Sequence, residues 1–389
     1  MSQRNILLKL CPIFADLVSF RLSAGIGDTD PNPKLFIDIH LLIKYNEQNR
    51  KGDDIMQTYS LFDHPLKVSG VPFFERDKKL TRLPDALIAQ LPHLDHLGRR
   101  CPGARVAFKT DSPTFTVKVT LKTLTVDVGM SLFSCQSVQV MLGERENARH
   151  LGVVNPPDYH TKTFEKTFHK SSELEQITVY FPRNEQVEMV EFSVEDKATV
   201  SAPTPYKYTK PVVFYGSSIT EGGCSCNTTN AYNAILSRWL DFDFYNLGFS
   251  GNAKGELVMA DYINTFDMGA FVYDYDHNAP TVEHLASTHK PFFDRIREVH
   301  PSIPILMMTR PAEVYTEEMK LRRKIVKSTY DAAVAAGDKN VYFIDGETFY
   351  GETDRNLCSF DNCHPNDLGF FRMAVVIRPV LKQMLDSTM

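Results

Sequence analysis

The order of strand-like and helix-like segments after residue 210 constrains the fold most strongly. Short apolar runs alternate there with longer amphipathic stretches. Strands separated by helices usually run parallel in one sheet, and the crossover connections place the helices on its two faces. The sequence therefore predicts a three-layer α/β domain with a parallel sheet. The runs that we predict as strands are 212–215, 242–246, 270–275, 303–308 and 341–344.

Two helices of this region have clear boundaries in the sequence. Thr316 is a suitable N-cap for a helix with glutamates in its first turn, and Gly337 is a suitable end for it. The last helix should begin after residues 366–369, which read Asn-Asp-Leu-Gly. Pro379 lacks a backbone N–H, so we expect it to kink or shorten that helix.

The segment before residue 204 carries a different pattern, in which apolar and polar side chains alternate. Several such runs, bounded by turn-forming residues, are typical of antiparallel strands in a β-sandwich. We therefore expect a β-sandwich domain over 57–203, with one helix over 83–91 and a linker over 201–205, followed by the α/β domain over 204–389. The runs that we predict as strands are 115–121, 124–128, 177–181 and 187–194.

The start of the chain carries no clear periodicity, and residues 1–56 are predicted as an unassigned N-terminal extension. Met56 follows a polar run, so an artificial extension upstream of a true start is one hypothesis. The first apolar patch is interrupted by Lys9, Pro12 and Asp16, unlike a secretory signal. No run approaches the roughly 18 apolar residues of a membrane span. These features predict a cytoplasmic protein without a membrane partner.

Composition narrows the partners and the chemistry further. A formal net charge of -5 argues against nucleic acid as a partner. The seven cysteines are odd in number and widely spread, so we expect no disulfide framework. Cys224 and Cys226 are too close together for the usual zinc spacing, and Cys358 and Cys363 are far away in sequence. We expect buried free thiols, with pocket lining or an occasional disulfide as the alternative, and we expect no metal or other cofactor.

The candidates for covalent catalysis lie at two ends of the α/β region. Ser218 follows the first predicted strand directly, at the sheet edge where open α/β folds bind ligands. The helix after it offers free N–H groups to a developing oxyanion. Asp361 and His364 are three residues apart, so the carboxylate can orient the imidazole and stabilise its cation. A turn serine, a capping aspartate and an exposed histidine are the structural alternatives.

Further candidates follow the second, third and fourth predicted strands. Gly251 and Asn278 could donate hydrogen bonds to an oxyanion, although a loop glycine and a turn asparagine would look the same. His277 is a rival to His364 as the base. Arg310 could bind a substrate carboxylate or pair with an acidic residue of the segment after the third predicted strand, 274–278.

The combination of serine, glycine, asparagine and Asp-x-x-His in this order resembles the SGNH (GDSL-type) esterase and lipase family over roughly residues 210–389. The upstream β region is similar to the N-terminal sandwich of one branch of that family. Residues 105–112 (Arg-Val-Ala-Phe-Lys-Thr-Asp-Ser) are similar to the characteristic stretch of that branch. Two positions differ from the family pattern. Ser217 stands where the family often has an aspartate, and residues 274–278 do not contain the family's usual Gly-x-Asn-Asp sequence.

The resemblance implies a role for each of five residues. Ser218 would be the nucleophile, His364 the general base and Asp361 the carboxylate that orients it. Gly251 and Asn278 would form the oxyanion hole together with the Ser218 N–H.

The function implied by the resemblance is acyl transfer through an acyl-enzyme, without a metal. Our main hypothesis is a serine carboxylic-ester hydrolase that removes small acyl groups, such as acetyl, from a carbohydrate or a similar small substrate. The carbohydrate rests on an analogy between the sandwich and carbohydrate-binding modules. An acyltransferase with the same Ser-His-Asp site and a carbohydrate-binding protein with a vestigial site are the alternatives. The sequence does not indicate an oligomeric state.

Overall fold

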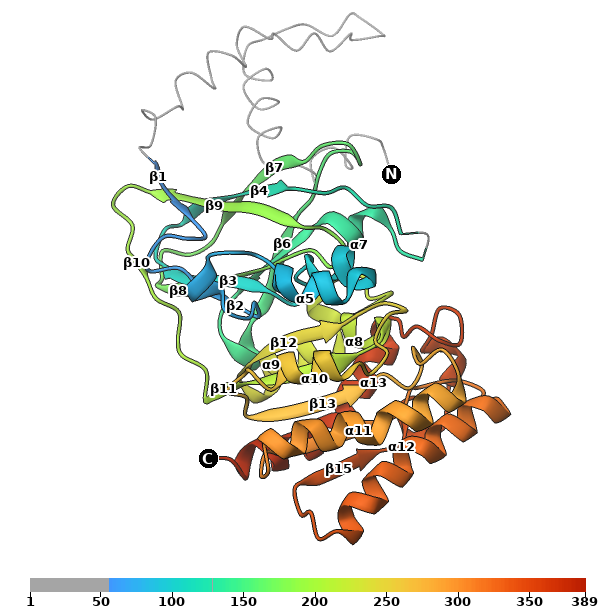
Figure 1. Cartoon of the computed structure of the whole chain (residues 1–389). Coiled ribbons are helices and arrows are strands. Elements are labelled where there is room, and N and C mark those ends of the chain that lie inside the picture. The colour runs from blue at the N-terminus through green and yellow to red at the C-terminus, as the bar shows by residue number, and fades with distance from the viewer. Residues whose placement is uncertain (1–55, 128) are drawn as a thin grey trace, which may run out of the picture. The chain divides into compact units, whose positions relative to one another are not determined.

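The parallel sheet predicted by the alternating pattern is present in the C-terminal half of the chain. The computed structural model describes residues 56–127 and 129–389 (Figure 1). The sheet has the order β12-β11-β13-β14-β15, and every pair of neighbouring strands is parallel. All five predicted strands are therefore confirmed. Their bounds are Tyr208–Gly216 for β11, Phe242–Gly248 for β12, Ala270–Asp274 for β13, Ile305–Met308 for β14 and Val341–Ile344 for β15.

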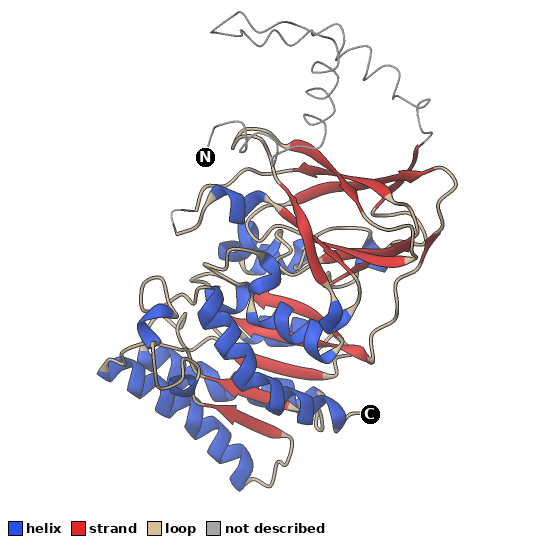
Figure 2. Cartoon of the chain, turned by 180° about the vertical axis from the view of Figure 1, so that it is seen from behind, coloured by secondary structure: helices blue, strands red, loops and turns tan. Residues whose placement is uncertain are grey.

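Helices cover both faces of this sheet, as Figure 2 shows from behind. Successive side chains of a strand point to opposite faces. Val213 and Tyr215 of β11 therefore pack with α10 (Leu257–Ile263), α11 (Val282–Val299) and α12 (Glu317–Ala335). Val212 and Phe214 pack with α9 (Tyr232–Leu240) and α13 (Asp367–Asp386) on the other face. Because helices bury both faces of the sheet, a ligand can reach it at the carboxyl ends of the strands, where open α/β folds bind their ligands.

The boundaries predicted for the helix capped by Thr316 are confirmed, but two predictions for the last helix are wrong at least in part. The Thr316 hydroxyl accepts a hydrogen bond from the Met319 N–H at the start of α12, and Gly337 has a φ of +86° after its end.

Helix α13 begins at Asp367, within residues 366–369 rather than after them, because the Asn366 side chain caps it by accepting a hydrogen bond from the Gly369 N–H. The effect predicted for Pro379 is also wrong in part. Helix α13 continues through Pro379 to Asp386 and is not shortened. Proline in a helix costs about 3 kcal/mol. Burial of Ile377 and Leu381 on either side of it, at about 1.5–3 kcal/mol each, offsets that cost.

The N-terminal half forms the predicted sandwich of antiparallel sheets. One sheet has the order β1-β9-β4-β7, and the other has the order β10-β3-β8-β5-β6 with β2 beside β3. Side chains of β4 alternate between buried and half-buried, as the period-2 pattern requires. The strands are β1 (Met56–Ser60), β2 (Lys67–Ser69), β3 (Arg105–Thr110), β4 (Thr114–Leu121), β5 (Val138–Leu142), β6 (Arg149–Val154), β7 (Thr163–His169), β8 (Glu175–Tyr180), β9 (Val187–Glu195) and β10 (Val200–Ser201).

The strand predicted over 124–128 is wrong in its described part, because residues 124–127 form a loop. The reason is the buried side chain of Glu185, which accepts hydrogen bonds from the Thr123 hydroxyl at 2.8 Å and the Thr125 N–H at 2.6 Å. A Thr125 N–H bonded to a side chain does not join a strand ladder. The predicted helix over 83–91 is confirmed as α5 (Asp85–Gln90).

Buried arginines join the sandwich half to the α/β half, and Ile55–Met389 forms one compact unit. The Arg105 guanidinium lies 2.8 Å from the Asp243 carboxylate at the start of β12 and 4.8 Å from the centre of the Phe244 ring. The domain boundary near residue 204 stays a prediction. The predicted extension, 1–56, lies outside the described residues apart from Met56. None of the helices in the described ranges is both long and apolar enough to cross a membrane.

Candidate active site

The candidate nucleophile lies in the turn between β11 and the short helix α8 (Ser218–Glu221). Ser217 is the N-cap of α8, and its hydroxyl accepts a hydrogen bond from the Ile219 N–H at 3.1 Å. Ser218 therefore occupies the first position of the helix, where an N–H has no partner within the helix. Among the described residues, nothing accepts a hydrogen bond from the Ser218 N–H.

A buried carboxyl group supports this turn from the neighbouring strand. Asp274, the last residue of β13, accepts a hydrogen bond from the Thr220 hydroxyl at 2.5 Å. A Cβ atom added to Gly216 would lie 1.7 Å from Asp274 Oδ1, so only glycine leaves room for this carboxyl. Burial raises the pKa of Asp274 well above its ordinary value, although the hydrogen bond from Thr220 opposes the shift. The Asp274 carboxyl group therefore lies beside the nucleophile turn, although Ser217 stands where the family often has an aspartate.

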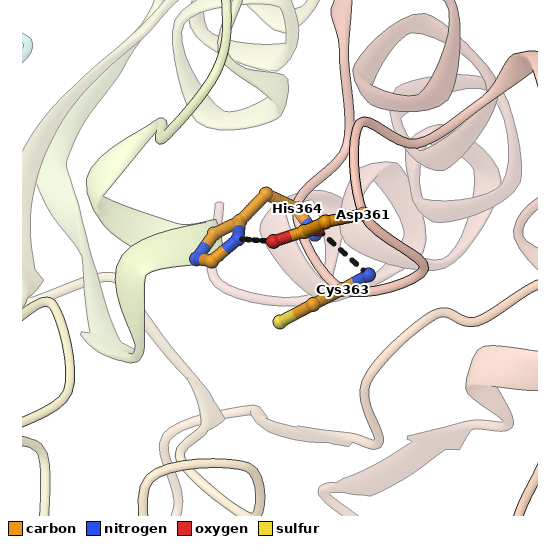
Figure 3. Close-up of side chains that lie close together, drawn as sticks. All are labelled: Asp361, Cys363 and His364. Carbon is orange, nitrogen blue, oxygen red and sulfur yellow. Dashed lines mark hydrogen bonds and ion pairs between the residues drawn. The ribbon is translucent and has the colours of Figure 1, made fainter. Parts of the chain in front are cut away.

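The structure brings Ser218, His364 and Asp361 together in one hydrogen-bonded chain. The Ser218 hydroxyl lies 2.8 Å from His364 Nε2. His364 Nδ1 lies 2.8 Å from Asp361 Oδ2, and Figure 3 shows this contact. The His364 backbone N–H also donates to the Asp361 carboxylate, at 2.7 Å. Since the carboxylate can only accept, Nδ1 carries the proton and Nε2 is free to accept from the serine. Partial burial opposes ionisation of Asp361, but the hydrogen bonds from His364 outweigh it and lower the pKa of the carboxyl group.

The turn that carries His364 is held by hydrogen bonds from the loop after β14, which contains Arg310 and Glu313. Asn362 has a φ of +61°, which is rare for a residue with a side chain. Its side-chain oxygen accepts from the Glu313 N–H at 2.9 Å, and its carbonyl oxygen accepts from Arg310 Nη2 at 2.8 Å. These contacts fix the conformation that turns the Asp361 side chain toward the imidazole.

Arg310 and His277 form a second polar group beside this turn. Arg310 Nη1 donates to His277 Nδ1 at 2.7 Å, so the ring proton is on Nε2, which lies 2.8 Å from Cys363 Sγ. Burial, together with Arg310, lowers the pKa of His277 to about 3, and burial raises the pKa of Cys363 to about 11. Both nitrogens of His277 are thus occupied away from Ser218. Arg310 is itself buried and donates from three nitrogens to protein atoms.

The predicted oxyanion donors lie on the loops after β12 and β13. Gly251 is exposed and has a φ of +69°. The Asn278 side-chain oxygen accepts a hydrogen bond from the Ala253 N–H at 3.3 Å, which joins the two loops. Within the described ranges, the Gly251 N–H and the Asn278 side-chain NH₂ donate to no protein acceptor. Both groups are therefore available to a substrate.

The four cysteines near the site are free thiols in the structure. The prediction that these thiols are buried is confirmed for Cys358 but wrong for the other three, because Cys224 and Cys363 are half-buried and Cys226 is exposed. Asp361, Cys363 and His364 offer ligand atoms within 4.8 Å of one another, and these are the residues drawn in Figure 3. The two imidazole nitrogens of His364 already contact Ser218 and Asp361.

Three charged residues behind the nucleophile turn are not among the site residues predicted from the sequence. Glu221 is the last residue of α8, and Arg82 and Arg183 approach its carboxylate from the N-terminal half. No local signal marks them, because the contacts join segments far apart in the chain.

Comparisons with known proteins agree with this arrangement. The model of the GDSL-like lipase/acylhydrolase family matches residues 209–382, and a model for the N-terminus of SGNH-hydrolase-type esterases matches residues 58–200. The chain belongs to the SGNH (GDSL-type) esterase and lipase family. It carries the N-terminal domain of the esterase branch, and membership makes it a serine enzyme of the ester-hydrolysing class, as the resemblance implied. Among curated proteins, none matches the sequence.

Solved structures show how widely this two-part SGNH fold is shared. A protein described as a GDSL-like lipase, from Bacteroides ovatus ATCC 8483, is 25% identical, with a TM-score of 0.76 over 85% of this chain and 98% of that chain. A salicylyl-acyltransferase from a tetracycline biosynthetic pathway is 20% identical, with a TM-score of 0.69 over 85% and 97%. A family two carbohydrate esterase from Clostridium thermocellum, in complex with cellohexaose, is 17% identical, with a TM-score of 0.54 over 73% and 93%. The latter two resemblances concern the fold alone.

Proposed function

We propose that this SGNH protein is a serine carboxylic-ester hydrolase that removes small acyl groups, acetyl above all, from a carbohydrate or a similar small substrate. The observation that carries the proposal is the hydrogen-bonded chain from Ser218 through His364 to Asp361. It pairs a hydroxyl with one imidazole nitrogen while a carboxylate accepts a hydrogen bond from the other. This arrangement activates a serine for attack on a carbonyl.

In the first step, His364 Nε2 takes the proton of the Ser218 hydroxyl while Oγ bonds to the ester carbonyl carbon. The carbonyl π electrons move to the oxygen, and the N–H groups of Ser218, Gly251 and Asn278 donate to this oxyanion. When the tetrahedral species collapses, the bond to the alcohol oxygen breaks and His364 returns the proton to that oxygen. Loss of one oxyanion donor typically costs about 10²–10³ in rate, so Asn278→Ala tests the least conventional of the three.

In the second step, water takes the place of the alcohol. His364 accepts a proton from the water as its oxygen attacks the acyl carbon, and the same donors hold the second oxyanion. The acid then leaves and Ser218 regains its proton. Asp361 stays ionised throughout, consistent with the lowered pKa of its carboxyl group, and stabilises the imidazolium.

Two features support an uncharged substrate such as an acetylated sugar. The fold is that of a family two carbohydrate esterase solved with cellohexaose. Arg310 is a candidate ligand for a substrate carboxylate by its position, but its side chain already donates to protein atoms from three nitrogens. We assign it instead to holding the turn around His364.

The test is the intact mass of the protein after treatment with a fluorophosphonate, followed by assays on short p-nitrophenyl esters and acetylated sugars. Wild type should gain one adduct and cleave an ester, whereas Ser218→Ala should do neither. Ser217→Ala is the matched control, and it should still react. Folded wild-type protein that neither gains an adduct nor cleaves any ester would contradict the proposal and favour a carbohydrate-binding protein with a vestigial site.

An acyltransferase is the second candidate, because a salicylyl-acyltransferase has the same two-part fold. The chemistry is identical until a hydroxyl acceptor replaces water in the second step. Product partition decides between the two: a hydrolase releases acid even when a sugar or an alcohol is present at millimolar concentration. A dominant transfer product under those conditions would identify an acyltransferase.

A further inference from the structure

A carboxylate that the mechanism does not use lies directly behind the nucleophile turn. Glu221 follows Ser218 by three residues, and its side chain is fully buried. Its Oε2 accepts a hydrogen bond from the Ser250 N–H at 3.0 Å. Ser250 precedes Gly251, whose N–H we place in the oxyanion hole. The carboxylate thus holds the peptide next to a proposed catalytic donor.

Arg82 approaches this carboxylate from one side. Its Nη2 lies 3.6 Å from Glu221 Oε1, and its side chain is 1% exposed. Its Nη1 donates to the carbonyl oxygens of Asn246 at 2.8 Å and Gly248 at 2.6 Å, at the end of β12. Burial lowers the pKa of Arg82 to about 10, and the negative charge of Glu221 opposes this shift. Arg82 therefore fixes both the carboxylate and the strand that leads to Ser250.

Arg183 approaches from the other side, from the loop between β8 and β9. Its Nη2 lies 3.6 Å from Glu221 Oε2, and its Nη1 lies 3.6 Å from the Asp127 carboxylate. A Cβ atom built on Gly223 would lie 3.2 Å from Arg183 Nη2 and 3.5 Å from His364 Cδ2. This guanidinium is therefore close to the catalytic imidazole as well as to Glu221.

The geometry indicates attraction between charges rather than a set of ideal hydrogen bonds. Among the described residues, Glu221 Oε1 and Arg183 Nε are buried without a hydrogen-bond partner. A buried carboxylate without a counter-charge would be very costly, and removing one partner of a buried pair leaves the other uncompensated. Here two cations from the N-terminal half of the chain lie beside one anion of the α/β half, and Asp127 supplies a second negative charge next to Arg183.

We propose that Glu221 is a positioning residue for the Ser250–Gly251 peptide, and that Arg82 and Arg183 hold it in place, so that the N-terminal half completes the oxyanion hole. This inference rests on the proposed function, because it assumes that Gly251 donates to the oxyanion. An ionised acceptor binds an N–H about twice as strongly as a neutral one. The sandwich half is thereby a part of the catalytic apparatus rather than an appended binding module.

The experiment compares Arg183→Met with Arg105→Met. Both arginines are buried in the N-terminal half and pair with acidic residues of the α/β half, but among the described residues Arg105 pairs with Asp243 and forms no ion pair with Glu221. We expect Arg183→Met to lower kcat at least about tenfold, approaching the ~10²–10³ cost of losing one donor, with KM changed less than twofold. Arg105→Met should lower the melting temperature and leave kcat of the folded fraction unchanged.

A second measurement does not depend on catalysis. Hydrogen–deuterium exchange in the peptide 249–253 should be faster in Arg183→Met than in wild type, and unchanged in Arg105→Met. If wild type shows no esterase activity, the proposed function fails and this exchange difference still tests the positioning role. Where a methionine variant does not fold, Arg183→Gln and Arg105→Gln, which also remove the charge, replace the pair. Equal effects of the two substitutions on kcat and on exchange would overturn the proposal, as would an Arg183 variant that behaves like wild type.

Discussion

The nucleophile turn and the base turn meet at one hydrogen bond but are held in different ways. Ser218 is 3% exposed and is surrounded by packed groups, including the Asp274 carboxyl that fills the space left by Gly216. The side chains of His364 and Asp361 are 28% and 40% exposed. Their turn is positioned by hydrogen bonds to Asn362 from another loop.

Because of this difference, we expect substitutions in one turn to affect mainly stability and substitutions in the other to affect mainly catalysis. Close packing at Gly216 and Ser218 leaves no space for change, so a substitution there must disturb the sheet edge itself. Hydrogen bonds in a half-exposed turn can be replaced by water, so substitutions there should shift the imidazole while the fold persists. The two turns should therefore respond to mutation in opposite ways.

The largest expected effect is a loss of activity without a loss of stability at the base turn. His364→Ala should lower kcat by about 10⁴ or more, because the serine loses its base. Its melting temperature should stay close to that of wild type, since the removed ring is half-exposed. Steady-state hydrolysis of a p-nitrophenyl ester and a thermal melt measure both. A melting temperature far below that of wild type would refute the proposed separation.

At the nucleophile turn we expect a substitution to lower the stability of the fold. Gly216→Ala puts a Cβ atom 1.7 Å from Asp274 Oδ1, so we expect a loss of more than about 3 kcal/mol in the free energy of unfolding. Gly351→Ala is the matched control. Its φ of +68° strains an alanine, but no atom lies within 4 Å of the added Cβ. Urea unfolding should show a cost of only about 1 kcal/mol for this control. Equal losses for both variants would mean that the contact between the added Cβ and Asp274 does not determine the loss of stability at Gly216.

A smaller effect tests how the base turn is held. Arg310→Met removes the donors to His277 and to the Asn362 carbonyl, and we expect kcat to fall about tenfold through a displaced imidazole. Arg310→Lys should recover part of this loss. A substrate-binding role would instead raise KM and leave kcat unchanged, so the two parameters distinguish positioning from binding.

The smallest effect concerns the pH dependence of stability. Burial raises the pKa of Asp276 from 3.8 to about 6, although hydrogen bonding to the Arg310 N–H opposes the shift. The native state therefore keeps a proton that the unfolded state loses between about pH 4 and 6. The stabilisation is complete below pH 4 and is lost as the pH rises through 6, with a slope of at most about 1.4 kcal/mol per pH unit.

Urea unfolding of Asp276→Asn between pH 4 and 7 checks this dependence, because the amide cannot titrate. The variant should lose less stability than wild type as the pH rises. Asp196→Asn, at an exposed position, is the control and should keep the wild-type slope. An unchanged slope in Asp276→Asn would contradict the expected protonation. Burial also raises the pKa of Asp274, and the negative charge of Asp276 contributes to that shift, so the difference between the two proteins reports the effect of Asp276 on both carboxyl groups.

The parts of the fold and site that the sequence predicted share a local cause. Strand and helix periods, the Thr316 cap, and the spacing of Asp361 and His364 all depend on neighbours within a few residues. The failures come from distant partners. Glu185 converts a predicted strand into a loop, and the ion pair of Arg183 with Glu221 joins residues that are 38 apart in the chain.

Roles of individual side chains at the site were harder to predict than their positions. Arg310 does lie at the sheet edge, where its place after the fourth strand suggested. Which atoms would occupy its donors could not be read from the chain, because Asn362 and His277 approach from other segments. A pattern places a residue at an edge, whereas its role depends on which groups fold against it.

The hydrogen bond between Ser218 and His364 spans 146 positions in the chain. A ribosome makes the serine long before the histidine, and α13, whose buried side chains close one face of the sheet, follows later still. A nascent or prematurely terminated chain that lacks these residues carries the serine without its base. Esterase activity should therefore appear only after synthesis has passed His364, so incomplete products would be catalytically silent.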